Sequence, residues 1–572
     1  MSLKISRFVL FLDQNIIKRK IPRIVLFVIV SGLISTLLYL FLYHRYPVYF
    51  THVNWIYQRG GDTFQHQLGW EFFRHEPWHF PIGKINSLGY PFGTNLTYLD
   101  SIPLLAIPFK ILSPLIEPRF QYLGLWEFIS IYLQFVIGVG ILREFTKSRI
   151  AILLGAILLV LSPPMIWRAF VHSSLTAHWF ILATIWICIR EYHQKKPPRW
   201  LWPALFSISI LVHLYFIPII LPFWAVSQYF SHRRGKKFNS ILLEFIIIFI
   251  TILFTGFCLG IFTFGVSDLE RWGFGYYSWN LNGFINPQAT SSILNGMSQG
   301  TKGQYEGYSY LGLGVLFLLV LGFSLYTQKD FKRNHLNFFL PLFISSLIYI
   351  LLALSDKAYL NNKLLWNITL PQQLHSYLSI FRSSGRFIWP VFYLFFLFAI
   401  ISVIRNTKFP AFFLILAITI QIVDIQPLYS ARGTNQFVPY EDPLISNFWK
   451  SAGSSNRSII LYPATESAMD SYGPIAEFAQ INKMNLNWGY FARSDNSAIE
   501  EYAEMQINEL QQGQADPETL FIFYNDQGYQ VADSLTSENI VTCYIDGYKI
   551  SFSRQNGVLR DSKSWDNLCE LP

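Results

Sequence analysis

The sequence predicts a polytopic α-helical membrane protein with a separate α/β domain at its C-terminal end. Hydrophobic residues make up 52% of the 572 positions and charged residues only 14%, whereas a soluble chain normally has about a quarter charged residues. Apolar runs of roughly 20 residues, long enough to cross a bilayer, recur along most of the chain. From residue 429 onward the chain instead carries nine basic and 19 acidic residues. We therefore expect a membrane domain, 1–428, and a soluble domain, 429–572.

The net charge of +9 does not indicate a nucleic-acid partner. The basic residues lie between apolar runs, as in the cytoplasmic loops of membrane proteins. This distribution predicts a cytoplasmic N-terminus, and it places the long first loop (44–101) and the C-terminal domain outside. The first apolar run, 24–43, follows a basic stretch and has no small-residue cleavage site, so we expect an uncleaved helix.

The alternation of basic and polar loops predicts about eleven crossings. The Pro-rich segment 102–116 must then lie at the interface or re-enter the membrane. The apolar block 200–230 has basic flanks on both sides, so we predict a hairpin of two short helices that bends near 213–218. One long tilted helix is the alternative, but it would break the charge rule.

The C-terminal domain has recognisable local signals. The stretches "NRSIILYP" and "ETLFIFYND" predict buried strands, and "SAIEEYAEMQINELQQ" predicts an amphipathic helix. Alternation around Asp546-Gly547 predicts a β-hairpin. Cys543 and Cys569 can pair if this domain is outside, but the sequence alone does not decide it.

The first loop carries the most candidate chemistry. Asp62 and Asp100 are placed where a carboxylate can act as a general base or help to hold a divalent metal, Mg or Mn. For Asp62 the alternative is a helix N-cap. For His66 the alternative is a hydrogen-bonded structural histidine, and for Arg74 it is surface pairing with Glu71.

A second candidate region is "FRSSGRFIWP". Arg382 and Arg386 are four residues apart, so on a helix they would share one face and could hold a phosphate or diphosphate by forked hydrogen bonds. The alternative is snorkelling to the interface. The scarcity of arginine on the outer side of membrane proteins favours a function.

Other outer segments could line the same cavity. Trp167, Arg168, His172 and His178 gather at one predicted outer turn, and Asp268 and Glu306 lie in a large outer loop. An interfacial belt is the alternative for the first group. The sequence has no zinc-type His/Cys spacing, nucleotide-binding glycine loop or nucleophile elbow.

These segments resemble the GT-C superfamily of integral membrane glycosyltransferases, which use polyprenyl-phosphate-linked sugars. The stretches "GGDTFQHQLGWEFFRHEPWHFPIG", "LGYPFGTNLTYLDSIPLLAIPFKILSPL", "LSPPMIWR" and "SSGRFIWP" are more narrowly similar to an uncharacterised bacterial family of GT-C type. The resemblance implies that Asp62 is the catalytic base and that Asp100 assists with acceptor or metal. It departs from the best-known members because no Asp-Glu pair opens the loop. The expected substrate contacts are His66, Arg74, His172, Glu306, Arg382 and Arg386.

The resemblance implies an inverting hexosyl- or pentosyltransferase in the bacterial cytoplasmic (inner) membrane. Its donor would be a polyprenyl-phosphate sugar, and its acceptor an envelope glycan, lipid or protein at the outer face. The alternatives are a lipid-linked glycan flippase or polytopic transporter, and a catalytically inactive assembly protein. A transporter would place ionisable residues near the membrane midplane. His213 in the predicted hairpin is the one feature of that kind.

Overall fold

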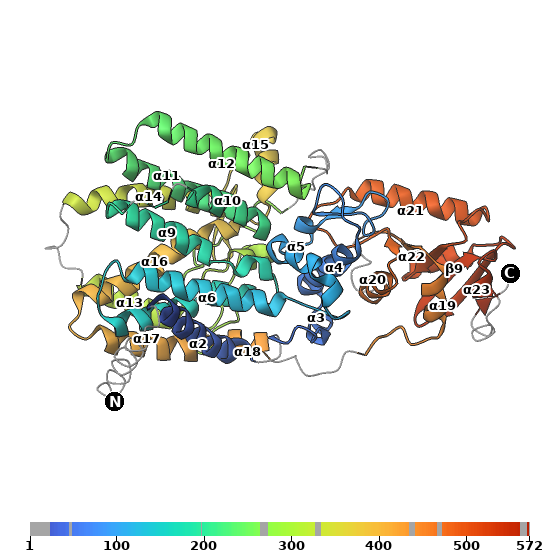
Figure 1. Cartoon of the computed structure of the whole chain (residues 1–572), viewed down its shortest axis with the longest axis horizontal. Coiled ribbons are helices and arrows are strands. Elements are labelled where there is room, and N and C mark those ends of the chain that lie inside the picture. Colours follow the sequence, from blue (N-terminus) through green and yellow to red (C-terminus); the bar gives the residue numbers. More distant parts are fainter. Residues whose placement is uncertain are drawn as a thin grey trace.

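The computed structural model describes residues 23–44, 48–195, 197–198, 200–262, 273–325, 333–433, 441–465, 472–560 and 569–570. Apolar helices form a bundle, the first loop covers one end of it, and the C-terminal domain lies beyond that loop (Figure 1). The two predicted parts of the chain are therefore separate in space, and the first loop lies between them.

The bundle consists of helices of very different length. They are α2 (Arg23–Tyr43), α6 (Leu123–Leu142), α7 (Arg149–Val160), α8 (Pro163–Arg168), α9 (Trp179–Tyr192), α10 (Leu201–Val212), α11 (Phe216–Arg233), α12 (Phe238–Leu259), α13 (Leu313–Leu325), α14 (Arg333–Leu354), α16 (Trp389–Asn406), α17 (Pro410–Asp424) and α18 (Gln426–Gly433). Among the described residues, six segments are long and apolar enough to cross a membrane, and the bent pair α17 and α18 would make a seventh. The chain is thus a membrane protein, while the number of eleven crossings stays a prediction.

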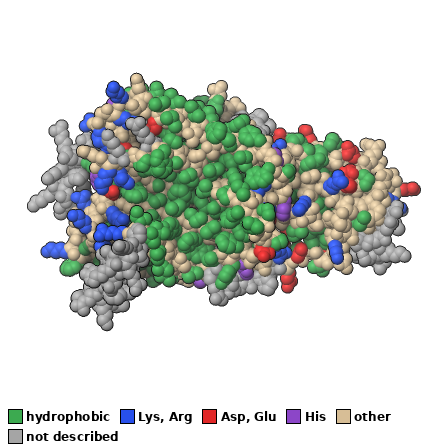
Figure 2. Space-filling view, in the orientation of Figure 1, with side chains coloured by type: hydrophobic (Ala, Val, Ile, Leu, Met, Phe, Trp, Pro, Cys, Tyr) green, Lys and Arg blue, Asp and Glu red, His purple; other side chains and the backbone are tan. Residues whose placement is uncertain are grey.

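The surface of the bundle is suited to lipid. Large apolar side chains of α2 and α12, such as Leu37 and Phe254, are exposed. Figure 2 shows a broad apolar belt between an end rich in Lys and Arg and the end that carries the C-terminal domain. Inside the bundle, small residues allow close packing. A Cβ on Gly314 of α13 would lie 2.1 Å from the Ala417 carbonyl of α17.

Two predictions about irregular segments hold. The apolar block 200–230 is divided into α10 and α11, with the break at residues 213–215, where the bend was expected. The segment 102–116 forms α5 (Pro103–Ile111) and the short η3 (Ser113–Leu115), which are too short to cross a bilayer. Leu115 is exposed there, and the interfacial or re-entrant placement of the segment stays a prediction.

The C-terminal domain is an α/β unit, as predicted. Its sheet has the order β10-β8-β9-β7-β5-β6, with β5 parallel to β6 and β7 and the other pairs antiparallel. The strands are β5 (Ser458–Tyr462), β6 (Asn485–Leu486), β7 (Thr519–Phe523), β8 (Ile540–Ile545), β9 (Tyr548–Ser553) and β10 (Cys569–Glu570), and the helices are α19 (Phe448–Ser455), α20 (Tyr472–Ile481), α21 (Asn496–Gln511), α22 (Asp526–Asp533) and α23 (Gly557–Arg560). Cys543 is disulfide-bonded, and Cys569 lies opposite it in the ladder.

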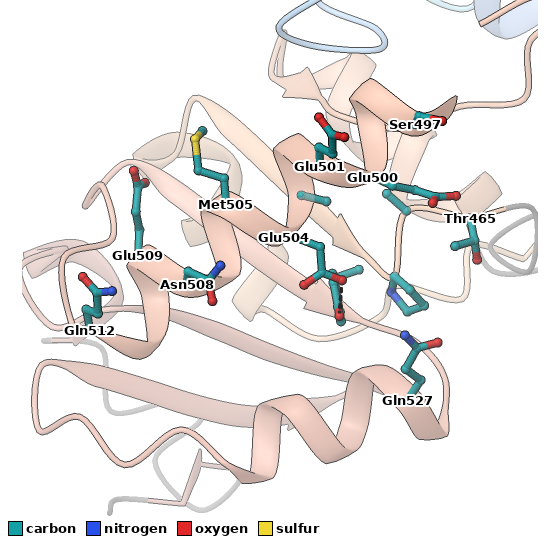
Figure 3. Close-up of a pocket in the computed structure, with 14 residues that line it drawn as sticks. Thr465, Ser497, Glu500, Glu501, Glu504, Met505, Asn508, Glu509, Gln512 and Gln527 are labelled. Carbon is teal, nitrogen blue, oxygen red and sulfur yellow. Dashed lines mark hydrogen bonds between the residues drawn. The ribbon is translucent and has the colours of Figure 1, made fainter. Parts of the chain in front are cut away.

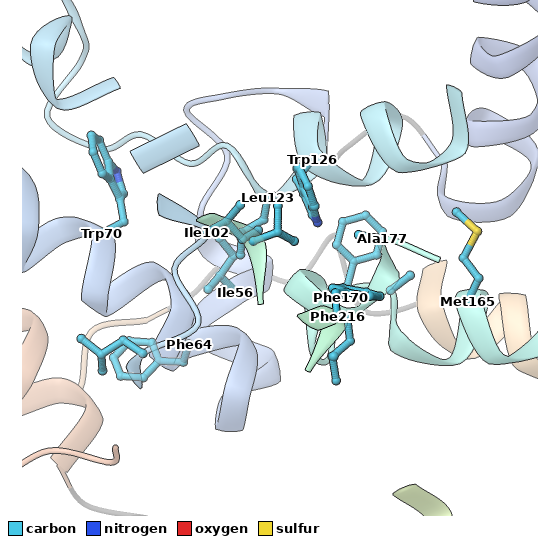
Figure 4. Packing of buried hydrophobic residues seen from close by; sticks show 14 of the residues in the cluster. Ile56, Phe64, Trp70, Ile102, Leu123, Trp126, Met165, Phe170, Ala177 and Phe216 are labelled. Carbon is cyan, nitrogen blue, oxygen red and sulfur yellow. The ribbon is translucent and has the colours of Figure 1, made fainter. Parts of the chain in front are cut away.

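The first loop is itself structured. It contains α3 (Asn54–Arg59), α4 (Gly61–His75), β1 (Lys84–Ile85), β2 (Thr94–Asn95) and η2 (Leu96–Tyr98). Its inner side joins a continuous apolar core with the bundle, in which Ile56 and Trp70 of the loop and Trp126 of α6 take part (Figure 4).

The other side of the first loop holds the C-terminal domain. The backbone N–H of Gly89 donates to the Leu486 carbonyl at 2.8 Å, and the N–H of Leu486 donates to the Ser87 carbonyl at 2.8 Å. Phe64 of α4 packs edge-on against Tyr472 of α20, with ring centroids 6.1 Å apart. The C-terminal domain is therefore fixed directly to the loop that carries the candidate acids.

A second loop follows α14. It contains the hairpin β3 (Lys357–Leu360) and β4 (Lys363–Asn367), followed by α15 (Gln372–Leu378), η7 (Ser379–Phe381) and η8 (Ser384–Ile388). The short η5 (Lys302–Gly307), from the loop before α13, packs against η8.

Candidate functional site

The site begins on helix α4, where Asp62 and His66 are four residues apart and share one face. Asp62 lies in the first turn of α4, and the N-cap residue is Gly60, which has no side chain to cap the helix. The Asp62 carboxylate instead lies 3.1 Å from Nδ1 of His172. Asp62 is therefore part of a tertiary contact and does not cap the helix.

Asp100 reaches the same place because its segment is pressed against α4. Ser101 Oγ donates to the His66 carbonyl at 2.8 Å. A Cβ on Gly69 would lie only 2.3 Å from Ser101 Oγ. Asp100 has a φ of +51°, in the left-handed region that non-glycine residues rarely adopt and that is often found at functional sites. Glycine at position 69 thus permits the close approach that brings Asp100 beside His66.

His172 connects the two acids. Its Nδ1 faces Asp62, and its Nε2 lies 3.2 Å from Oδ2 of Asp100. The turn before it is fixed against α4, since Thr63 Oγ1 donates to the Phe170 carbonyl at 2.6 Å. The His66 and His172 rings meet edge to face, with centroids 5.2 Å apart.

His213 completes the group from the break between α10 and α11. Its Nε2 lies 3.4 Å from Oδ1 of Asp100, and its ring centroid is 5.5 Å from that of His172. From the sequence, His213 was predicted only to be a polar residue at the bend of the hairpin. A polar ring at a break between two apolar helices was the available signal. We refer to Asp62, His66, Asp100, His172 and His213 as the acid–histidine cluster.

The electrostatics of the acid–histidine cluster favour ionised acids. Burial would raise the pKa of Asp62, but the hydrogen bond and charge of His172 lower it below its ordinary value. Burial would likewise raise the pKa of Asp100, but the neighbouring histidines lower it well below its usual range. Burial would lower the pKa of His172, yet the two carboxylates raise it. Burial lowers the pKa of His66 to about 4, so its ring is neutral at pH 7.

Three members of the cluster have the arrangement of a metal site. His66, Asp100 and His172 each offer one ligand atom, and these atoms lie within 4.8 Å of one another. His66 is fully buried, yet neither of its ring nitrogens has a hydrogen-bond partner among the described residues. Buried polar atoms are normally paired, so this ring fits a ligand role. Two imidazoles and one carboxylate suit Zn or Mn better than Mg, which prefers oxygen ligands.

A second charged group, the Glu306 cluster, lies near the acid–histidine cluster. Oε2 of Glu306 accepts from Arg168 Nη2 at 2.7 Å and from Arg386 Nε at 2.8 Å. Burial alone would raise the pKa of Glu306, but the two guanidinium groups lower it well below its usual range. The Arg386 guanidinium also lies over the Tyr215 ring, 4.6 Å from its centroid. Arg168 was predicted only as a lining residue and Glu306 as a substrate contact, and their ion pair was not predicted.

The remaining predicted residues have varied surroundings. Arg74 donates to Ser113 Oγ and to the carbonyls of Glu117 and Pro118, so it holds the loop after α5, and no contact links it to the acid–histidine cluster within the described ranges. Arg382 follows η7 and makes no ion pair with a described residue. Asp268 lies outside the described residues.

A separate cavity of about 660 Å³ lies in the C-terminal domain. It is bounded by α21 and by the end of β5, and Glu500, Glu501, Glu504 and Glu509 contribute to its lining (Figure 3). None of the residues that line it belongs to either charged cluster, so it is a different feature from the candidate site.

The fold and the site define a polytopic α-helical membrane protein with an acid–histidine cluster at one end of its bundle and an α/β domain fixed beside it. The family model "Domain of unknown function (DUF6311)" matches residues 32–426, and the model "DUF6311 C-terminal domain" matches residues 448–553. The chain belongs to the DUF6311 family. No curated protein matches the chain.

Several solved structures are distantly similar. The Archaeoglobus fulgidus oligosaccharyltransferase tethered with an acceptor peptide is 10% identical, with a TM-score of 0.47 over 91% of this chain and 73% of that one. The same archaeal enzyme, AglB, in complex with an inhibitory peptide and a dolichol-phosphate is 10% identical, with a TM-score of 0.44 over 91% and 74%. Its complex with Zn and sulfate is 11% identical, with a TM-score of 0.38 over 90% and 71%.

Proposed function

We propose that this protein is a GT-C-type glycosyltransferase that moves a sugar from a polyprenyl-phosphate-linked donor to an acceptor hydroxyl. The observation that carries the proposal is the convergence of the acid–histidine cluster with the arginines of the second loop. The Arg386 guanidinium lies over the Tyr215 ring, 4.6 Å from its centroid, and the Tyr215 N–H donates to Nδ1 of His213, a member of the cluster, at 3.1 Å. One site thus offers a base, a candidate cation site and guanidinium groups for a phosphate.

In the proposed reaction the acceptor oxygen attacks the anomeric carbon of the sugar. The bond from that carbon to the phosphate oxygen breaks, the electron pair leaves with the phosphate, and the anomeric centre inverts. Asp62 takes the acceptor proton, since its carboxylate is ionised and remains about one-third exposed, at 34% of the side chain. Arg382 and the terminal nitrogens of Arg386 stabilise the charge that develops on the phosphate.

A divalent cation held by His66, Asp100 and His172 would act as a Lewis acid toward the leaving phosphate. The chain's own part is to fix these ligands. His172 presents Nε2 toward Asp100 while Nδ1 is oriented by Asp62, the kind of outer contact that sets the orientation of a metal-bound imidazole. His213 contacts the remaining oxygen of Asp100 and restricts its rotation.

The proposed location is the bacterial cytoplasmic membrane, with the cluster and the C-terminal domain at the outer face. The basic end of the bundle, opposite the C-terminal domain (Figure 2), would lie in the cytoplasm, following the positive-inside rule. The donor lipid would lie against the apolar surface of the bundle, and an envelope glycan, lipid or protein would supply the acceptor from the aqueous side.

The decisive experiment compares lipid-linked sugars and surface glycans by mass spectrometry in host cells that express wild-type protein or Asp62→Asn. We expect the variant to accumulate a polyprenyl-phosphate sugar and its glycans to lose one residue, whose mass names the sugar. Glu117→Gln is the matched control, because it makes the same carboxylate-to-amide change at an exposed position.

Other outcomes would contradict the transferase. A lipid-linked glycan trapped on the inner face would favour the flippase, for which His213 in the bundle is the supporting feature. Unchanged lipids and glycans, with normal amounts of the variant protein in the membrane, would remove Asp62 from the mechanism.

A further inference from the structure

The C-terminal domain reaches the second loop through the segment that follows β6. The Ala492 N–H donates to the Tyr98 carbonyl of the first loop at 2.9 Å. The next residue, Arg493, donates from Nη2 to the Ile380 carbonyl of η7 at 2.8 Å. Arg493 thus lies where the C-terminal domain, the first loop and the second loop meet.

Arg382 is two residues beyond Ile380, whose carbonyl accepts from Arg493, so the two arginines lie in adjoining segments. Burial lowers the pKa of Arg493 below its ordinary value, and the charge of Arg382 adds to this lowering. Neither arginine forms an ion pair with any residue that the structure describes. Two partly buried like charges repel one another unless an anion compensates them. Their placement therefore indicates a site for an anion.

A third arginine, Arg386, lies in η8, four residues after Arg382. Its guanidinium lies 4.6 Å from the centroid of the Tyr215 ring, and Tyr215 is also within electrostatic reach of Arg493. The hydroxyl of Tyr215 accepts from the Ser383 N–H at 2.9 Å, which keeps the ring in place. Arg386, from the second loop, thus lies on the ring of Tyr215, and Arg493, from the C-terminal domain, is within electrostatic reach of it.

The acid–histidine cluster lies directly beside this tyrosine. The Tyr215 N–H donates to Nδ1 of His213 at 3.1 Å, and Nε2 of the same ring contacts Asp100. An anion held by the arginines would therefore lie next to the groups proposed to activate the acceptor.

We propose that Arg493, Arg382 and Arg386 form one anion site shared by the C-terminal domain and the second loop, and that it binds the phosphate or diphosphate of the lipid-linked donor. This inference rests on the proposed function for the identity of the donor. It makes the C-terminal domain a part of the donor site, because Arg493 can be supplied only by that domain.

The test is direct binding to the full-length protein in detergent, measured by isothermal titration calorimetry without turnover. The probes are farnesyl diphosphate, as a short prenyl diphosphate, and inorganic diphosphate. Because a hydrogen bond to a charged group contributes more than a neutral one, we expect Arg493→Gln and Arg382→Gln each to weaken binding of farnesyl diphosphate about 10- to 100-fold. Arg493→Lys should restore part of the affinity. Lys450→Gln, an exposed position of the same domain, should leave it unchanged.

The outcomes distinguish recognition of the phosphate group from recognition of a lipid donor, and they test the anion site separately from the transferase. A parallel loss for both probes supports recognition of the phosphate group itself, whereas a loss for inorganic diphosphate alone overturns the assignment to a lipid donor. If Arg493→Gln and Arg382→Gln both bind like wild type, the inference is wrong even where Asp62→Asn abolishes transfer. If their affinity falls but Asp62→Asn changes no glycan, the anion site stands and the transferase falls.

Discussion

The acid–histidine cluster and the Glu306 cluster lie close together but differ in how their charges are satisfied. Glu306 shares one oxygen between Arg168 and Arg386, at 2.7 and 2.8 Å, and all three side chains are buried. In the acid–histidine cluster, His66 is equally buried but neither of its ring nitrogens has a described partner. A buried polar group without a partner costs more free energy than one that is paired. The Glu306 carboxylate is therefore satisfied within the folded protein, while the acid–histidine cluster is suited to receive a ligand.

The largest expected effect is on catalysis in the acid–histidine cluster. Asp100→Asn should reduce transfer by about 10²- to 10⁴-fold, as expected for loss of a catalytic or metal-holding carboxylate. The fold should persist, because asparagine tolerates the left-handed φ of +51° at this position. In vitro transfer assays, together with thermal unfolding in detergent, would measure both quantities. A stable variant with wild-type turnover would remove Asp100 from the site.

A substitution in the Glu306 cluster should mainly lower the stability of the fold. Glu306→Ala leaves two buried arginines without their carboxylate, and breaking such a pair costs about 3–5 kcal/mol. Denaturant unfolding of the purified protein would measure this loss, and Glu117→Gln is the control. If Glu306→Ala unfolds like the wild type, the Glu306 cluster does not stabilise the fold.

The next largest effect is on bound metal, which we expect in the acid–histidine cluster and not in the Glu306 cluster. Protein purified without a metal-affinity tag should carry Zn or Mn by elemental mass spectrometry. His66→Ala should lower metal affinity by at least the 10- to 100-fold typical even of residues beyond the ligands. His232→Ala, an exposed histidine at the end of α11, should not. A metal-free wild type with full transfer, or equal metal in both variants, would contradict a metal role.

The smallest expected effect is that of a substitution at Tyr215, which lies between the two clusters. Tyr215→Phe removes the acceptor for the Ser383 N–H but keeps the ring under Arg386. A lost hydrogen bond of this kind costs about 1 kcal/mol, so we expect a several-fold rise in the KM for the donor with little change in kcat. Steady-state kinetics would test this. A fall in kcat at unchanged KM would indicate that Tyr215 contacts the reacting groups.

Part of the site was predictable because its signals are local. Asp62 and His66 share a helical face by their spacing, and His172 was noticed as an ionisable residue at a predicted outer turn. The structure brings these residues together with Asp100. It also separates Arg74 from them, because its guanidinium is occupied by the loop after α5. Spacing along one helix cannot distinguish a residue that faces the site from one that holds a neighbouring segment.

The membrane domain, the α/β domain with its Asp546-Gly547 hairpin, the break at His213 and the loop that carries Asp62 were all predictable from the sequence. These follow from hydrophobic periodicity, turn chemistry and charge distribution, which act over short stretches of chain. Only the tertiary structure decided that His213 contacts Asp100, that Arg168 and Arg386 share Glu306, and that Arg493 reaches η7. These partners are separated by about 80 residues or more in the sequence. Long-range packing of helices and loops, which no local pattern encodes, brings them together.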